Sequence, residues 1–219
     1  MCDLFIPADI LSLIINLLSI NEHTKFFRLS KSIHSFMLNH YFKIHMTTYK
    51  VPVSYLHNNL QTLVLFNDKL IDDNILKNLS QLRHLKLPLN EKITDIGLGY
   101  IPLITNLILN YNKNITNEGL KYIPHVTSLN LEWNKNITND GLKYIPLITN
   151  LDLSSNENIT DLGLQYIPHI TNLNLYYNKN ITTVCHQFIP LINELVVDGH
   201  YYSFNITTTK ICPTRNINW

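Results

Sequence analysis

Leucines spaced 22 residues apart set the pattern of apolar positions along most of the chain. Seven of them keep this step: Leu63, Leu85, Leu107, Leu129, Leu151, Leu173 and Leu195. Two positions after each stands a second apolar residue: Leu65, Leu87, Leu109, Leu131, Leu153, Leu175 and Val197. Alternate residues of a strand point to the same face, so each pair predicts a short strand with one buried face. A fixed period of this length indicates stacked repeats, in which each unit buries its apolar face against its neighbours.

One asparagine follows each strand pattern at the same step: Asn90, Asn112, Asn134, Asn156 and Asn178. A buried turn leaves backbone N–H and C=O groups that need partners. A carboxamide both donates and accepts hydrogen bonds. We therefore predict a column of asparagines, one per coil, that satisfies the turn backbone at the same place each time.

The second half of each repeat predicts a short helical turn. From Ile137 to Pro146 the sequence reads I-T-N-D-G-L-K-Y-I-P, and Thr138 or Asn139 is the candidate N-cap. Pro146 should end the helical turn, because the residue before a proline is disfavoured in helical conformation. A strand opposite a bulkier helical turn makes each coil a wedge. Stacked wedges should curve, with the parallel sheet on the concave face.

This repeat resembles the leucine-rich repeat, L-x-x-L-x-L-x-x-N, over roughly residues 56–200. The phrase I-T-D-x-G-L at Ile93–Leu98 and Ile159–Leu164 is similar to the leucine-rich repeats of F-box proteins. The resemblance implies an α/β leucine-rich-repeat solenoid, with a curved parallel β-sheet on the concave face and short helices or turns on the convex face. We expect about seven strands in residues 46–200 and a C-terminal cap or tail in residues 201–219.

Residues 1–45 lack the 22-residue pattern and predict a separate helical module. Ile10, Leu11, Ile14 and Ile15 follow helical spacing, and further leucines occupy the opposite side. A helix that is apolar nearly all round must be covered on more than one side. A segment of about forty residues cannot supply that cover from its own core. Either the repeat stack or another protein must pack against it.

The same segment resembles the F-box, which docks onto the Skp-type adaptor of cullin-RING ubiquitin ligases. The resemblance rests on I-P-A-D-I-L from Ile6 to Leu11, on Glu22, and on L-S-K-S-I from Leu29 to Ile33. The chain departs from the family at Ile33, where tryptophan is common. The resemblance implies adaptor binding by six residues: Ile6, Pro7, Ile10, Leu11, Ile14 and Ile15. Alternatively, these helices only cap the first repeat, as solenoids require.

Side chains that face away from the predicted core offer a surface for a target protein. Aromatic residues on a rigid concave sheet are common anchors in protein interfaces, and polar residues beside them add contacts. The predicted target-binding residues are Tyr111, Asn130, Glu132, Trp133, Asp152, Asn174, Tyr176 and Tyr177. In the alternative interpretation, Tyr111 and Trp133 fold over the loop and cover the asparagine turn.

A second aromatic column stands just before each Ile-Pro: Tyr100, Tyr122, Tyr144, Tyr166 and Phe188. A binding site should vary along a solenoid, whereas a structural position should repeat. The regularity of this column therefore predicts packing on the outer face.

Composition and charge exclude several classes of function. With 17 basic and 16 acidic residues, the chain has no large field to attract nucleic acid. Cys2, Cys185 and Cys212 do not form a disulfide frame, so we expect a reducing compartment. The start Met-Cys-Asp does not resemble a signal peptide, and Ile10–Ile20 is too short for a membrane span. The expected location is the cytoplasm or nucleus, without membrane contact.

No set of residues suggests catalysis, a metal or a cofactor. The ten histidines are scattered, and Cys185 next to His186 lacks the ligand spacing of a zinc site. Four of the six glycines belong to the repeat, so no glycine loop is available for phosphate. The chain is therefore expected not to be an enzyme and to need no cofactor.

With the F-box resemblance, these observations predict the substrate-recognition subunit of a Skp/cullin/F-box ubiquitin ligase. Its F-box would dock the adaptor, and its concave face would bind an unknown target protein. The alternative is a non-catalytic interaction scaffold whose first helices only cap the solenoid. Heavy use of Ile and Asn is typical of an AT-rich genome, such as that of a large DNA virus or a protist. A viral protein of this kind would be a decoy in the host cytoplasm.

Overall fold

The computed structural model describes residues 43–45, 60–65, 70–197, 200–203 and 212–213. The predicted adaptor-binding residues lie outside the described residues: Ile6, Pro7, Ile10, Leu11, Ile14 and Ile15.

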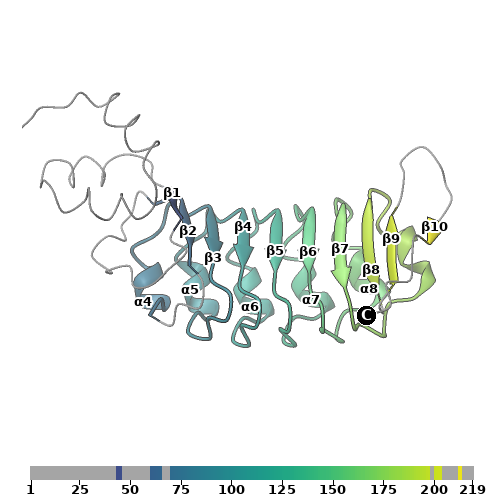
Figure 1. Ribbon diagram of the computed structural model, residues 1–219, viewed down its shortest axis with the longest axis horizontal. Coiled ribbons are helices and arrows are strands. Elements are labelled where there is room, and N and C mark those ends of the chain that lie inside the picture. Colours follow the sequence, from purple (N-terminus) through teal and green to yellow (C-terminus); the bar gives the residue numbers. More distant parts are fainter. Residues whose placement is uncertain (1–42, 46–59, 66–69, 198–199, 204–211, 214–219) are drawn as a thin grey trace, which may run out of the picture.

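The strands form one sheet in which spatial order follows chain order (Figure 1). Its strands are β1 Lys43–His45, β2 Thr62–Val64, β3 His84–Lys86, β4 Asn106–Ile108, β5 Ser128–Asn130, β6 Asn150–Asp152, β7 Asn172–Leu175, β8 Glu194–Val197, β9 His200–Ser203 and β10 Cys212–Pro213. Neighbours from β1 to β8 pair in parallel, and β9 and β10 continue the sheet antiparallel. Leu107 pairs with Leu129, one period later, so the register equals the repeat.

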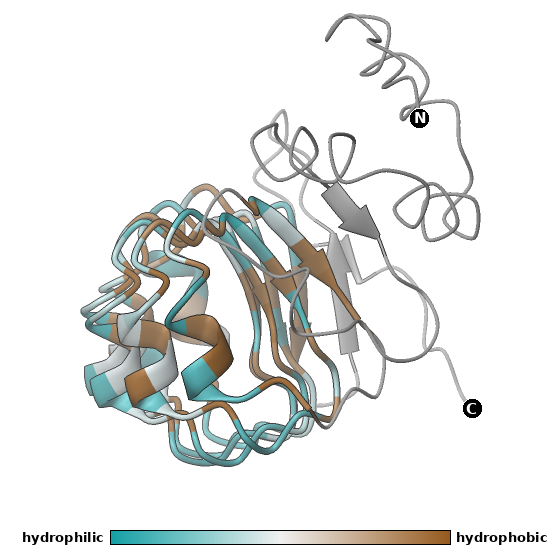
Figure 2. Ribbon diagram, turned by 90° about the vertical axis from the view of Figure 1, so that its left-hand side faces the viewer, coloured by the Kyte–Doolittle hydropathy of each residue, from teal (hydrophilic) through white to brown (hydrophobic). Residues whose placement is uncertain are grey.

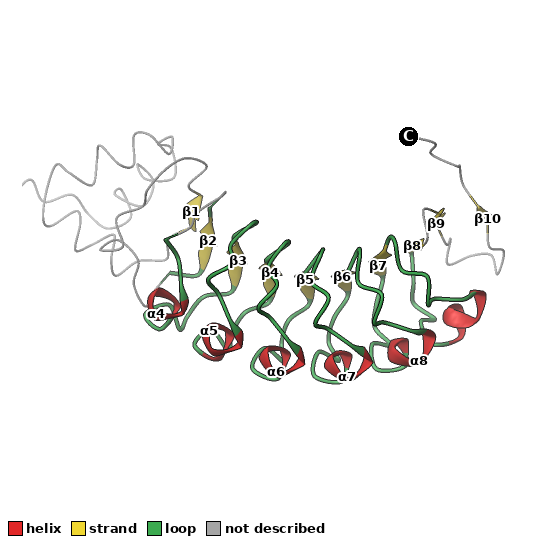
Figure 3. Cartoon of the chain, turned by 90° about the horizontal axis from the view of Figure 1, so that it is seen from below, coloured by secondary structure: helices red, strands yellow, loops and turns green. Residues whose placement is uncertain are grey.

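Each return segment carries a short helix on the opposite side of the coil. These are α4 Asp73–Leu76, α5 Asp95–Gly99, α6 Asn117–Leu120, α7 Asn139–Leu142, α8 Asp161–Leu164 and the 3-10 helix η2 Thr183–Gln187. Viewed along the long axis, helices and strands lie on opposite sides of the coil (Figure 2). The helices follow the outer arc and the strands the inner arc (Figure 3). The predicted solenoid with a parallel sheet on its concave face is confirmed.

The sheet extends past the repeats at both ends. The seven strands predicted from the leucine pairs are β2 to β8. Lys43–His45, within the segment assigned to the helical module, adds a parallel strand before them, and His200–Ser203 adds an antiparallel strand after them. Non-repeat segments therefore pair with both terminal repeats, as edge strands generally require.

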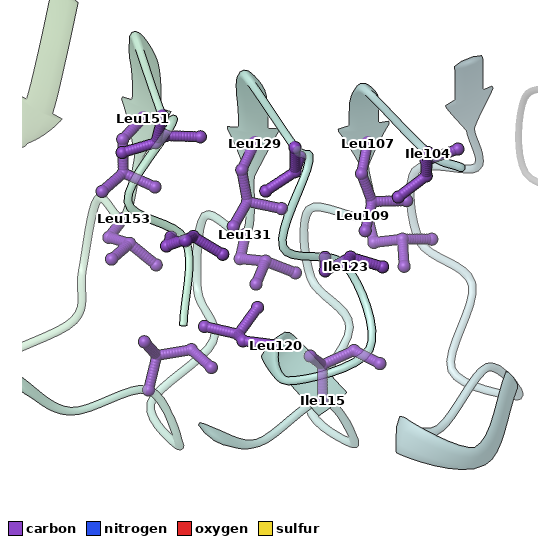
Figure 4. Packing of buried hydrophobic residues seen from close by; sticks show 14 of the residues in the cluster. Ile104, Leu107, Leu109, Ile115, Leu120, Ile123, Leu129, Leu131, Leu151 and Leu153 are labelled. Atoms are coloured by element: carbon purple, nitrogen blue, oxygen red, sulfur yellow. The ribbon is translucent and has the colours of Figure 1, made fainter. Parts of the chain in front are cut away.

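The leucine pairs point inward and meet apolar residues from the helical side (Figure 4). Leu107 and Leu109 are fully buried, as are Ile115, Leu120 and Ile123 of the return segment. Each such side chain contributes about 1.5–3 kcal/mol on burial. The core is one continuous cluster in which every coil covers its neighbours.

The asparagine column is buried and links each coil to the preceding one, as predicted. Nδ2 of Asn134 donates to the carbonyl oxygens of Asn112 and Ile115 at 3.0 and 2.7 Å. Its Oδ1 accepts the N–H groups of Asn136 at 2.8 Å and Ile137 at 3.3 Å. Equivalent bonds to the preceding coil are made by Asn90, Asn112, Asn156 and Asn178. One carboxamide per coil thus satisfies buried backbone groups in two coils.

Threonine, not asparagine, caps α7. The Thr138 hydroxyl accepts the N–H of Asp140, whereas Asn139 is the first helical residue. The prediction that Pro146 ends the helical turn is wrong, because α7 already ends at Leu142. The N–H groups of Tyr144 and Ile145 then bond to carbonyls three residues back, which tightens the chain into 3-10-like turns.

A carboxylate or carboxamide explains the column of repeat glycines. Asp95 at the start of α5 accepts the N–H and the hydroxyl of Thr116 in the next coil, at 2.8 and 2.6 Å. A Cβ on Gly119 would lie 2.3 Å from Oδ1 of Asp95. The same arrangement recurs at Gly97, Gly141 and Gly163. The sequence revealed these glycines but not the side chain that occupies the space beside each of them.

Candidate functional site

The concave face of β4 to β8 forms a shallow polar hollow of about 460 Å³. Residues before and after each first leucine face this side, because their neighbours point into the core. The polar residues that line the hollow include Asn130, Asn150, Asp152, Asn172, Asn174 and Glu194. Apolar Ile108 and Val196 lie in the same columns at the two ends.

Three predicted polar contact residues, Asn130, Asp152 and Asn174, form one network across β5, β6 and β7. Oδ2 of Asp152 accepts Nδ2 of Asn130 at 3.3 Å and Nδ2 of Asn174 at 3.1 Å. Its Oδ1 accepts the N–H and hydroxyl of Ser154 at 3.0 and 2.5 Å. The carboxylate is therefore held in place by neutral donors, and its negative charge is not compensated by them.

Carboxamides on the strands also hold the backbone that follows. Oδ1 of Asn130 accepts the N–H of Glu132 at 3.1 Å, and Oδ1 of Asn174 accepts the N–H of Tyr176 at 3.1 Å. These bonds connect the polar hollow to the chain segment that carries the predicted aromatic residues. The hollow and the aromatic residues therefore belong to one rigid surface.

The aromatic rim, which we define as Tyr111, Trp133 and Tyr177, lies beyond the strand ends rather than on the strands. Each of these residues has a positive φ, 66°, 64° and 60° respectively. Leu89 and Ser155 hold the same conformation in their coils, with φ of 63° and 62°. Left-handed backbone costs about 1–2 kcal/mol for a residue with a side chain, and glycine or asparagine adopts it most easily. Bulky residues at these positions are therefore unfavourable for the fold.

The left-handed turn has a structural cause. Trp133 donates its N–H to the carbonyl of Ser154 at 2.9 Å, which extends pairing past the strand, and buried Asn134 follows at once. The left-handed conformation changes the direction of the chain here, so that the asparagine side chain enters the interior of the coil. The sequence analysis did not predict this conformation. Its only sign in the sequence is that these residues always stand directly before an asparagine of the buried column.

The rim side chains remain accessible, although each contacts a neighbouring ring. The rings of Tyr111 and Trp133 stack with centroids 5.9 Å apart and planes inclined by 13°. Tyr176 and Tyr177 are in tilted contact at 4.1 Å. Trp133 is 44% exposed and Tyr177 55%. Rings that keep this much surface are available to a partner.

Charge on the concave side is divided along the solenoid. His84 and Lys86 lie on β3, whereas Glu132, Asp152 and Glu194 lie on or beside β5 to β8. Burial, and then the charge of Asp152, raises the pKa of the half-buried Glu132 carboxyl. Within the described part of the chain, neither an ion pair nor a hydrogen bond engages that carboxylate.

The second aromatic column lies on the convex face. Tyr100, Tyr144, Tyr166 and Phe188 pack against the core, as predicted, whereas Tyr122 is 50% exposed. Nζ of Lys121 lies 5.1 Å from the Tyr144 ring, and Nζ of Lys143 lies 5.0 Å from the Tyr166 ring. Such cation–π contacts contribute about 0.5–1 kcal/mol at exposed sites. This column therefore covers the outer face.

The described ranges contain no recognisable cluster of catalytic residues. No group of three or more His, Cys, Asp and Glu residues there is placed to hold a metal ion. Cys185 takes the glycine position of its repeat, and burial raises the pKa of its thiol to about 11, which keeps it protonated. None of the described helices is long and apolar enough to cross a membrane.

Comparison with protein-family models identifies the repeat. The model described as "Leucine Rich repeat" matches residues 102–123, 122–145 and 146–167. These are leucine-rich repeats. The comparison detected no F-box, and no curated protein matches the sequence.

Solved leucine-rich-repeat structures share the fold at low sequence identity. An internalin (inlF) from Listeria monocytogenes is 21% identical with a TM-score of 0.55, over 77% of this chain and 51% of that one. Internalin C2 from the same organism is 22% identical with a TM-score of 0.51, over 71% and 78%. A yeast complex of Rad7 and Elc1 is 20% identical with a TM-score of 0.49, over 60% of this chain and 39% of that one. The matched region thus spans about half or less of the yeast chain and of inlF, and the likeness concerns the fold alone.

Proposed function

We propose that this leucine-rich-repeat protein is the substrate-recognition subunit of a Skp/cullin/F-box ubiquitin ligase. The observation that carries target recognition is that an exposed aromatic rim, just beyond the strand ends, adjoins a polar hollow on the concave face. Adaptor docking is supported by the F-box-like order I-P-A-D-I-L from Ile6 to Leu11 in the same chain.

Target binding is favoured by how little the concave face has to reorganise. Its carboxylate and carboxamides are already tied to one another across β5, β6 and β7. Stacking of Tyr111 on Trp133 limits the motion of both rings. Side chains that are ordered beforehand lose less entropy on binding, so more of the contact energy becomes affinity.

In this proposal the chain contributes proximity rather than bond chemistry. It would act in the cytoplasm or nucleus and hold the target near the ubiquitin-bearing enzyme, which raises the effective concentration of the reacting groups. If the chain is viral, the same architecture would redirect the host ligase toward a new target.

Co-purification with a Skp-type adaptor tests the adaptor half of this proposal. Ile10→Asp with Leu11→Asp places two charges on the predicted docking face and should abolish co-purification. Ser12→Asp with Asn16→Asp adds the same charge at polar positions of the same segment and should retain it. Circular dichroism should show folded repeats in both variants. Failure of the unmodified protein to bind an adaptor, or equal binding by both variants, would refute adaptor docking.

Deletion of residues 1–40 separates the ligase subunit from a plain scaffold. A docking arm can be removed with little loss of stability, so the melting temperature should change little. A cap protects the first repeat, and its loss should lower the melting temperature sharply. A large drop, combined with no adaptor binding, would leave only the scaffold function.

A further inference from the structure

The concave columns change charge from one end of the solenoid to the other. Facing side chains on β3 include His84 and Lys86, and those on and beside β5 to β8 include the carboxylates of Glu132, Asp152 and Glu194. Among the described residues, the hollow itself is lined by no lysine or arginine. A partner that covers β5 to β8 must therefore bury uncompensated negative charge.

The three carboxylates differ in how many hydrogen bonds they already accept, and this difference indicates which one a partner can engage. Both oxygens of Asp152 already accept hydrogen bonds from Asn130, Asn174 and Ser154. Glu194 accepts Nδ2 of Asn172 through one oxygen at 2.7 Å. Glu132 is half-buried, and no contact described for it involves its carboxylate oxygens. Glu132 is therefore the carboxylate whose oxygens can accept new hydrogen bonds from a partner. Asp152 and Glu194 add to the negative electrostatic potential around it.

Glu132 immediately precedes Trp133, whose ring stacks on Tyr111. The aromatic face and the carboxylate thus occupy the same short segment beyond β5. A lysine or arginine side chain has an apolar stem and a charged end, and its charge is attracted both to a carboxylate and to a tryptophan face.

We propose that the target presents a basic segment to β5–β8, with a lysine or arginine that contacts Glu132 and the stacked rings of Tyr111 and Trp133. This inference rests on the proposed function and adds the chemistry of the target. The field of Asp152 and Glu194 favours further positive charge along the segment. Phosphate-rich partners are repelled by the same three carboxylates.

Labelled peptides of defined charge test the proposal by fluorescence anisotropy. The probe is a fluorescein-labelled 12-residue peptide of alternating lysine and serine, compared with glutamate–serine and asparagine–serine peptides of equal length. The full-length protein should bind the lysine peptide more tightly than both others. Binding should weaken as salt increases, because exposed charge pairs are screened.

Matched variants separate a local contact from net charge. Glu132→Gln should weaken the lysine peptide about threefold, and the triple variant with Asp152→Asn and Glu194→Gln about tenfold or more. Glu118→Gln makes the same change in net charge on the convex helix α6 and should leave the Kd unchanged. Trp133→Ala should weaken binding as well. Equal loss in the Glu118 and Glu132 variants, or no preference for the lysine peptide, would overturn the inference.

Adaptor co-purification, measured on the same variants, keeps the two proposals separate. The triple variant should still co-purify with the adaptor, because its changes lie in the repeats. Adaptor binding without lysine-peptide binding would refute the basic target and leave the ligase subunit standing. Lysine-peptide binding without adaptor binding would refute the ligase subunit and leave the basic target standing.

Discussion

Two columns of residues run along this solenoid, and they differ in how strictly they repeat. The buried column has asparagine in every coil from Asn90 to Asn178, and Asn112, Asn134, Asn156 and Asn178 each donate to two carbonyls of the coil before. The concave column one residue after each first leucine reads Val64, Lys86, Ile108, Asn130, Asp152, Asn174 and Val196. The first column satisfies identical backbone groups in each coil, whereas the second faces solvent and is free to vary.

Positions that hold the same residue in every coil have a structural role, whereas positions whose residue changes from coil to coil are available for recognition. A backbone turn that recurs every 22 residues demands the same carboxamide each time. A surface that binds one partner needs different side chains at different coils. The left-handed position combines both roles, since its backbone repeats while its side chain changes from leucine to tyrosine, tryptophan and serine.

The largest effect is expected where the repeating column is broken. Asn134→Ala removes two donated and two accepted hydrogen bonds and leaves their backbone partners buried. An unsatisfied buried group costs about 1–3 kcal/mol, so the variant should lose about 3–5 kcal/mol of unfolding free energy. Urea denaturation measures this loss.

Asn136→Ala is the matched control, because it makes the same replacement two residues later. The Asn136 side chain is exposed, and it donates to the carbonyl of Lys113. Loss of that bond should cost less than about 1 kcal/mol. Similar losses in the two variants would contradict the distinction between a buried column and a surface position.

A second large effect is expected at the glycine column. Gly119→Ala places a methyl group where Oδ1 of Asp95 lies, 2.3 Å from the ideal Cβ position. Asp95 cannot move aside without losing its two bonds to Thr116. We expect a loss of about 2 kcal/mol, as for overpacked cores, measured by thermal unfolding.

Gly99→Ala provides the control for glycine replacement itself. A Cβ there lies 3.7 Å from the Tyr122 ring, which is ordinary contact, so the variant should be neutral or gain up to about 1 kcal/mol from helix propensity. In an Asp95→Ala background, Gly119→Ala should cost less than it does alone, because the clash is gone. Equal costs in both backgrounds would show that Asp95 is not the cause.

The sequence was sufficient for the architecture because stacking propagates one pattern. The leucine pairs gave the strands and the buried face, and the step of Asn134 and its equivalents gave the inner column. The contacts between coils were not predictable in the same way. That Asp95 fills the space beside Gly119 depends on residues about one repeat apart. Thr138 rather than Asn139 caps its helix, and the Asn139 side chain instead bonds to Thr160 of the next coil.

The candidate site was predicted in its residues but not in its geometry. Alternation along the strand placed Asn130, Asp152 and Asn174 on the concave side, where the structure joins them in one network. The same alternation cannot describe Trp133, because the chain leaves the strand conformation before it and turns left-handed. Strand alternation predicts the direction of a side chain only within the strand itself.

A smaller effect of opposite sign is expected at the left-handed position. Ser155→Gly removes the side-chain penalty at a φ of 62° and should stabilise the protein by about 0.5–1 kcal/mol. Ser154→Gly, one residue earlier, loses the hydroxyl that donates to Asp152 and should destabilise it. Thermal unfolding of the pair measures both signs. Destabilisation by both would mean that the backbone at Ser155 is not strained.

The smallest effect is expected at Glu132, whose negative charge lowers the stability of the folded protein when no partner is bound. Burial and then Asp152 raise its folded-state pKa above the ordinary 4.5, so the ionised form is disfavoured in the folded protein. This penalty is present above the raised pKa and disappears as pH falls below 4.5. Glu132→Gln should therefore be more stable than the natural protein at pH 7, by about 0.3–0.5 kcal/mol given solvent screening.

Unfolding curves across pH distinguish this penalty from a general effect of the substitution. The advantage of Glu132→Gln should be constant near neutral pH and should shrink only as the pH falls through the raised pKa toward pH 4. In an Asp152→Asn background the advantage should be smaller but still present, because burial, the larger cause, remains. An advantage that persists unchanged at pH 4 would show that the carboxylate charge is not responsible.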